Sequence, residues 1–105
     1  MPAKLPDHYE SFKKRHAAVV EAHQALSARC HEAGPLDERA RRLAKLAVAV
    51  GARHEGAVHA QVRQALEAKV EPDAIRHVAI LAIPTIGFPA AMAALSWVED
   101  HLGER

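Results

Sequence analysis

The stretch GARHEGAVHAQ, residues 51–61, follows the apolar run Leu43–Val50 and decides how the chain folds. Gly51 interrupts the helical pattern of the residues before it. Beyond His54, apolar residues return every three or four positions, which is typical of one face of a helix. We therefore expect one helix to end at this stretch and another to begin near His54.

The same periodicity continues in both directions and predicts an all-α chain of about five to six helices. Residues 80–86 have strand-forming composition, but Pro84 lies among them and the preceding pattern is helical, so we expect no strand there. The expected helices cover residues 7–31, 37–50, 54–68, 72–82 and 89–102. Asp37 is expected to cap the second of them, and Ala47 to face inward with its apolar neighbours.

The first expected helix has one stripe at alternating four- and three-residue spacing. It consists of Phe12, His16, Val19, His23, Leu26 and Cys30. Two histidines in an apolar stripe have two interpretations. Either they lie at the boundary of a helix or subunit contact, or they line a site.

Composition restricts the class of protein. At 105 residues the chain predicts a single domain over 1–105, and half of it is apolar, as in globular proteins. Small residues and few aromatics give a thin core, so we expect a homo-oligomer that buries surface between subunits. The net charge of +1 and interspersed acids and bases predict no nucleic-acid partner. The sequence has no run of about 18 apolar residues, so we expect no membrane span. Residues 1–6 lack the apolar core of a signal peptide, so we expect a cytoplasmic protein.

The central stretch at 51–61 resembles the carboxymuconolactone decarboxylase / AhpD-like alkylhydroperoxidase family, and so do three further segments. They are LDERARRLAKLAVAV at 36–50, VRQALEAKVEPDAI at 62–75 and GFPAAMAAL at 87–95. The resemblance is strongest over 36–95 and implies an all-α fold assembled as homotrimers or homohexamers. Lys69 stands where the family usually has a turn glycine, so we expect a different left-handed residue in this turn.

The resemblance also implies where redox members carry their chemistry. Their glutamate, two cysteines and relay histidine correspond here to Arg42, His54, Ala57 and Gln61. None of the four is kept, and the single cysteine, Cys30, excludes a Cys-x-x-Cys pair. A thiol peroxidase needs a thiolate and a resolving thiol, so inherited peroxidase activity is not expected. The segment GFP at 87–89 is closer to the decarboxylase branch, which lacks the cysteine pair.

Four residues of the central stretch are candidate catalytic groups: His54, Glu55, His59 and Gln61. Glu55 and His59 are four apart and share one edge of the helix, where a carboxylate can orient an imidazole for acid–base chemistry. The alternative interpretation is a surface ion pair. His54 stands at the helix start, where the dipole favours a neutral imidazole, and shares the other edge with Gln61.

Two further residues are expected to bind substrate. Arg42 suits a carboxylate, and Phe88 is expected to form a pocket wall. His54 and His59 are five apart, about 140° around a helix, which does not fit the four-residue spacing of a zinc-binding helix. We therefore expect no metal and no cofactor.

Two functional hypotheses follow. The first is a thiol-independent lyase-like, decarboxylase-like or isomerase-like enzyme that acts on a small carboxylic acid or lactone. The second is a non-catalytic, oligomeric or binding member of the family. Residual peroxiredoxin-type antioxidant activity through Cys30 is a weaker third alternative, implied by the family only.

Overall fold

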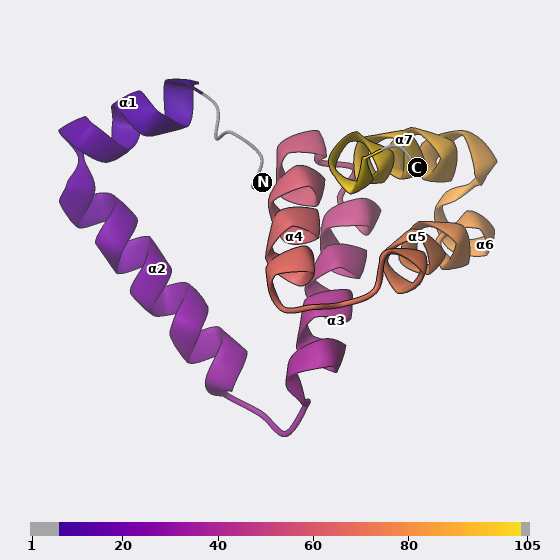
Figure 1. The fold of residues 1–105 in the computed structure, drawn as a ribbon, viewed down its shortest axis with the longest axis horizontal. Coiled ribbons are helices and arrows are strands. Elements are labelled where there is room, and N and C mark those ends of the chain that lie inside the picture. Colours follow the sequence, from indigo (N-terminus) through magenta and orange to yellow (C-terminus); the bar gives the residue numbers. More distant parts are fainter. Residues whose placement is uncertain (1–6, 104–105) are drawn as a thin grey trace. The chain divides into compact units, whose positions relative to one another are not determined.

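A computed structural model describes residues 7–103, which form seven helices and no strand within that range (Figure 1). The all-α prediction is confirmed. The chain divides into two compact units, one ending at Leu36 and the other beginning at Asp37. The expectations for residues 1–6 lie outside the described residues, and the single-domain prediction over 1–105 stays a prediction.

The first unit contains two helices, α1 (Asp7–Arg15) and α2 (Ala17–Glu32). The prediction of one helix over 7–31 was therefore wrong. His16 leaves the helical region, with φ −135° and ψ 52°. Its carbonyl accepts the first hydrogen bonds of α2, from the backbone N–H groups of Val19 and Val20, so the helix ends and restarts at this residue.

The apolar stripe of α2 is exposed. Leu26 has 61% of its surface accessible, and Cys30 is also exposed. Val20, outside the stripe, is the buried residue of this helix. The stripe is therefore not covered within the first unit, and both interpretations of it stay predictions.

The second unit contains α3 (Glu38–Gly51), α4 (Glu55–Glu67), α5 (Pro72–Leu81), α6 (Ile83–Ile86) and α7 (Phe88–Leu102). Helix α3 packs on α4, and both α4 and α5 pack on α7 (Figure 1). The largest fully buried side chains come from four of these helices: Leu46, Val50, Val58, Val62, Ile75 and Val98. Each such side chain contributes about 1.5–3 kcal/mol by leaving water, which makes this cluster the main source of stability.

Asp37 caps the start of α3, as predicted. Its carboxylate accepts a hydrogen bond from the Ala40 N–H at 2.8 Å. The expected orientation of Ala47 was wrong. The face of α3 that meets α4 is Leu46, Ala49 and Val50, and Ala47 is exposed on the side toward α5.

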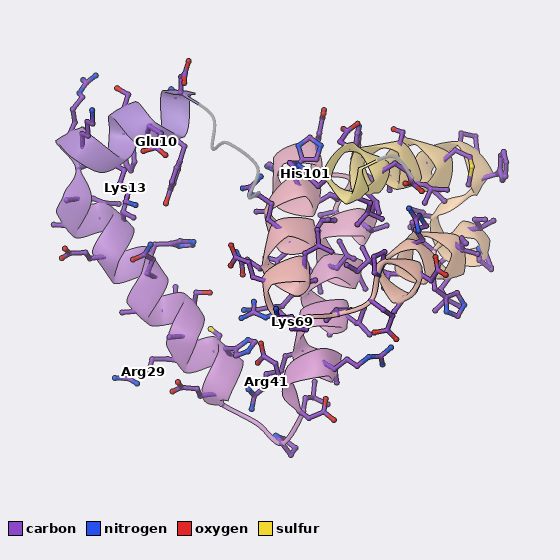
Figure 2. All side chains as sticks on the ribbon, viewed as in Figure 1. Glu10, Lys13, Arg29, Arg41, Lys69 and His101 are labelled. Atoms are coloured by element: carbon purple, nitrogen blue, oxygen red, sulfur yellow. The ribbon has the colours of Figure 1, made fainter. Side chains whose placement is uncertain are left out.

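Helix α4 ends in a Schellman motif. The Lys69 N–H donates to the Leu66 carbonyl and the Val70 N–H to the Ala65 carbonyl, both at 3.0 Å. Lys69 itself adopts the left-handed conformation, with φ 69°. The expectation that another residue would take this role was wrong, because the hydrogen-bond pattern holds the lysine there. Figure 2 shows Lys69 just beyond the end of α4.

The end of α3 repeats this arrangement. Arg53 has φ 58°, and its N–H donates to the Val50 carbonyl at 3.0 Å. The His54 N–H donates to the Ala49 carbonyl at 3.4 Å, which completes the motif. The chain therefore turns sharply, and α4 starts directly after His54.

Helix α5 ends at Leu81, and the single turn α6 replaces the strand-like segment. Gly87 follows with φ 94°, a conformation that suits glycine, and α7 begins at Phe88. Among the described residues, no helix combines the length and apolar character needed to cross a bilayer.

Candidate functional site

His54 is the N-cap residue of α4. Its Nδ1 atom accepts a hydrogen bond from the Ala57 N–H at 3.1 Å. This contact satisfies one of the free N–H groups at the helix start. It also occupies the Nδ1 lone pair, which leaves the Nε2 atom as the protonated nitrogen of the neutral ring. The geometry thus gives His54 a structural contact with the backbone of its own helix and does not bring its side chain to His59.

Glu55 and His59 do come together, and a residue from α7 joins them. His59 Nε2 lies 3.9 Å from Glu55 Oε2 and 3.0 Å from Asp100 Oδ2. The His59 side chain is 23% exposed, whereas both carboxylates are more than half exposed. These three residues, called the α4–α7 cluster below, form an imidazole held between two carboxylates on two packed helices.

Two basic groups border the α4–α7 cluster. The His101 ring stands edge-on to the His59 ring, with centroids 4.6 Å apart. Burial lowers the pKa of His101, as do the nearby charges of His59 and Arg63, while Asp100 raises it. Arg63 lies one turn after His59 on α4. Figure 2 shows His101 beside the start of α4.

Arg42 is already engaged within the protein. Its Nε donates to Glu38 Oε2 at 2.9 Å, and its Nη1 donates to Gln64 Oε1 at 2.8 Å. The side chain is 19% exposed. A substrate carboxylate at this position would compete with the Glu38 carboxylate for the same guanidinium.

The other two predicted site residues lie apart from these contacts. Gln61 is half-buried in α4, and its Oε1 atom is buried with no hydrogen-bond partner in the described structure. Phe88 is the first residue of α7 and is 61% exposed. Neither belongs to the α4–α7 cluster.

A pocket of about 370 Å³ opens between α3 and α5. Six apolar side chains line it, together with Arg39 and His77. The apolar residues are Leu43, Ala44, Ala47, Ala74, Val78 and Leu81. Val48, one turn after Ala44 on α3, is 72% exposed, and Leu81 of the pocket wall is 63% exposed.

The pairing of Glu55 with His59 was predicted from the sequence, whereas the contacts of Asp100 and His101 were not. The spacing of Glu55, His59 and Arg63 marks one face of α4 and was available in the sequence. Asp100 follows His59 by 41 residues, and only the packing of α7 on α4 brings it near. No local pattern signals that contact.

The fold and site define an all-helical protein in which one imidazole and two carboxylates meet between α4 and α7. The positions that carry two cysteines in redox relatives hold His54 and Ala57 here. A sequence model of the carboxymuconolactone decarboxylase family matches residues 8–100. The chain therefore belongs to this family, and the match spans both structural units. Comparisons with curated proteins and with solved structures found no match.

Proposed function

We propose that this protein is a thiol-independent enzyme that acts on a small carboxylic acid or lactone, with His59 as the acid–base group. The observation that supports this most is the 3.0 Å contact between His59 Nε2 and Asp100 Oδ2 across two packed helices. A carboxylate only accepts hydrogen bonds, so Nε2 carries the proton in this contact. Nδ1 is then the basic nitrogen of the ring.

Asp100 acts in this proposal as a positioning residue. It fixes the tautomer of His59 and stabilises the imidazolium that forms when Nδ1 takes a proton, as the aspartate does in hydrolase triads. Glu55 Oε2 lies 3.9 Å from the same nitrogen and places a second carboxylate beside the ring. His54 and Gln61 are not needed for this chemistry.

A carboxylic acid substrate also needs a positive group near the reacting atoms. Arg42 is bound to Glu38, so it is a poor candidate for this role. Arg63 follows His59 by one helical turn, and its charge already acts on His101. We therefore assign substrate-carboxylate binding to Arg63 in this proposal, since arginine binds carboxylates through two parallel hydrogen bonds.

The test is turnover of a panel of small lactone acids that includes carboxymuconolactone, measured as release of carbon dioxide or loss of lactone absorbance. His59→Gln is expected to lower kcat/KM by at least about 100-fold, the usual contribution of a positioned acid–base group. His77→Gln, on the exposed side of α5, is the matched control and is expected to keep activity. Turnover that survives His59→Gln, or no turnover of any panel member, would contradict the proposal.

A second candidate function is supported by the apolar surface of α3 and α5. Exposed apolar surfaces of this kind are typical of interfaces, and the family resemblance implies trimers or hexamers. In this alternative, the chain is a non-catalytic oligomeric member, and second copies cover Val48 and Leu81. The two candidates are separable, because the enzyme depends on His59 and the oligomer on the α3–α5 surface.

A further inference from the structure

We propose that Glu55, His59 and Asp100 bind a divalent transition-metal ion of the zinc type. One ligand atom from each residue lies within 4.8 Å of the others. Bonds of about 2.1 Å at angles between octahedral and tetrahedral place donor atoms roughly 3.0–3.5 Å apart. The His59–Asp100 contact of 3.0 Å is already in that range, and the His59–Glu55 contact of 3.9 Å is close to it.

The donor set selects the class of ion. One imidazole nitrogen and two carboxylate oxygens suit zinc and neighbouring first-row ions, whereas calcium and magnesium prefer oxygen donors alone. Both carboxylates are more than half exposed, so they can rotate toward an ion without disturbing the core. Three protein ligands leave at least one coordination position for water, as in catalytic rather than structural zinc sites.

Electrostatics also favours a cation here. Both carboxylates approach the same His59 nitrogen, and a single N–H cannot donate well to two acceptors in different directions. A divalent ion in place of that proton would contact all three side chains and neutralise both acids.

No metal site was expected from the sequence. The expectation of no metal rested on the five-residue spacing of His54 and His59, because that spacing places the two histidines on different faces of a helix. The site proposed here uses one histidine of α4, and its third ligand comes from α7.

The metal site does not rest on the proposed enzymatic function and competes with it. An ion on Nε2 shifts the remaining ring proton to Nδ1, which removes the basic lone pair that acid–base chemistry requires. A bound ion is therefore expected to suppress that activity. Metal binding measured without substrate tests only the site, so either proposal can fail alone.

The experiment is calorimetric titration of Zn²⁺ into the chelator-treated full chain, followed by absorption spectroscopy with Co²⁺. We expect saturable binding of one ion per chain and visible Co²⁺ bands that reveal an ordered site. His59→Gln, Asp100→Asn and Glu55→Gln are each expected to weaken binding by at least about tenfold, because even outer-shell changes cost that much. Helical circular dichroism verifies that each variant is folded.

Eight histidines make control variants essential. His77→Gln removes an exposed histidine outside the cluster, and Glu67→Gln removes an exposed acid at the end of α4. Both are expected to keep the affinity of the unmodified protein. The proposal is overturned if no Zn²⁺ binds, if His59→Gln binds as tightly as the unmodified protein, or if His77→Gln loses as much affinity as His59→Gln.

Discussion

At the scale of single residues, two long basic side chains occupy positions that usually favour glycine. Arg53 and Lys69 both have positive φ values, and both close a helix through Schellman hydrogen bonds. A non-glycine residue in this region is strained by its Cβ atom. The short connections after α3 and α4 therefore carry a local conformational cost.

Lys69→Gly is expected to stabilise the protein by up to about 1 kcal/mol, because relief of the strain exceeds the added freedom of the unfolded chain. The free energy of unfolding from urea titration measures this. Ala93→Gly, on the exposed face of α7, is the control and is expected to destabilise by about 1 kcal/mol. Equal destabilisation by both changes would show that Lys69 is not strained.

His54 is expected to matter for stability through its cap. His54→Ala removes the acceptor for the Ala57 N–H and is expected to cost about 1 kcal/mol, whereas His54→Ser supplies a new acceptor and is expected to cost little. Chemical denaturation of the two variants measures the difference. A serine variant as unstable as the alanine variant would rule out capping as the role of this side chain.

At the scale of helices, the core holds α3, α4, α5 and α7 together. Apolar residues close in sequence on one helix differ widely in how much of their surface is buried. Leu46 is fully buried, while Val48, two residues later, is 72% exposed. The i, i+3, i+4 pattern anticipated the helices that carry this core. It failed at Ala47, since an apolar residue can also border an uncovered surface.

Leu46→Ala is expected to lower the free energy of unfolding by about 2–5 kcal/mol, through lost burial and the cavity it leaves. Val48→Ala is the matched control and is expected to change it by about 0.5 kcal/mol or less, since its side chain lies in water. Thermal or urea unfolding compares the two. Similar losses at both positions would mean that Val48 is covered in solution.

One ion pair links the start of α3 to the start of α5. Arg39 donates to Glu71 through Nε at 3.3 Å and through Nη2 at 2.8 Å. The hydrogen bond from Arg39 lowers the pKa of the Glu71 carboxyl below its ordinary value of 4.5. Because the pKa is lower in the folded state, the ionised carboxylate stabilises the fold at a pH above the ordinary pKa. This stabilisation is lost as the pH falls through the lowered pKa of the folded state.

Glu71→Gln is therefore expected to be less stable than the unmodified protein at neutral pH, with a difference that disappears in acid. Unfolding free energies from pH 7 down to pH 3 measure the change, and low salt enlarges it because the pair is exposed. Asp73→Asn removes a carboxylate that pairs with Arg76 and not with Arg39. It is the control for the general effect of losing one negative charge on stability. A difference that grows toward acid pH would have the wrong sign for this account.

At the scale of the whole molecule, local sequence patterns anticipated the helices but not every boundary or contact. The break at His16 was missed because its neighbours continue a helical stripe without a proline or glycine. The α4–α7 cluster was anticipated only within α4, because Asp100 and His101 reach it through tertiary packing. Long-range contacts of this kind have no signature in a single helical segment.

The α3–α5 surface makes a prediction about assembly. If second copies cover it, Val48→Glu and Leu81→Glu are each expected to reduce the molar mass in solution toward that of one chain, because a buried unpaired charge opposes association. Light scattering after size-exclusion chromatography measures this. Ser96→Glu, on the exposed face of α7, is expected to leave the mass unchanged. An unmodified protein that elutes as a monomer would remove the oligomeric alternative.

The central proposal is that this family member works without a thiol, through His59 held by Asp100. The most direct measurement compares lactone-acid turnover by Cys30→Ala and His59→Gln with that of the unmodified protein. The account predicts unchanged kcat/KM in Cys30→Ala and a loss of at least about 100-fold in His59→Gln. Loss of turnover in Cys30→Ala, with His59→Gln still active, would contradict this proposal and would show that the reaction depends on the Cys30 thiol.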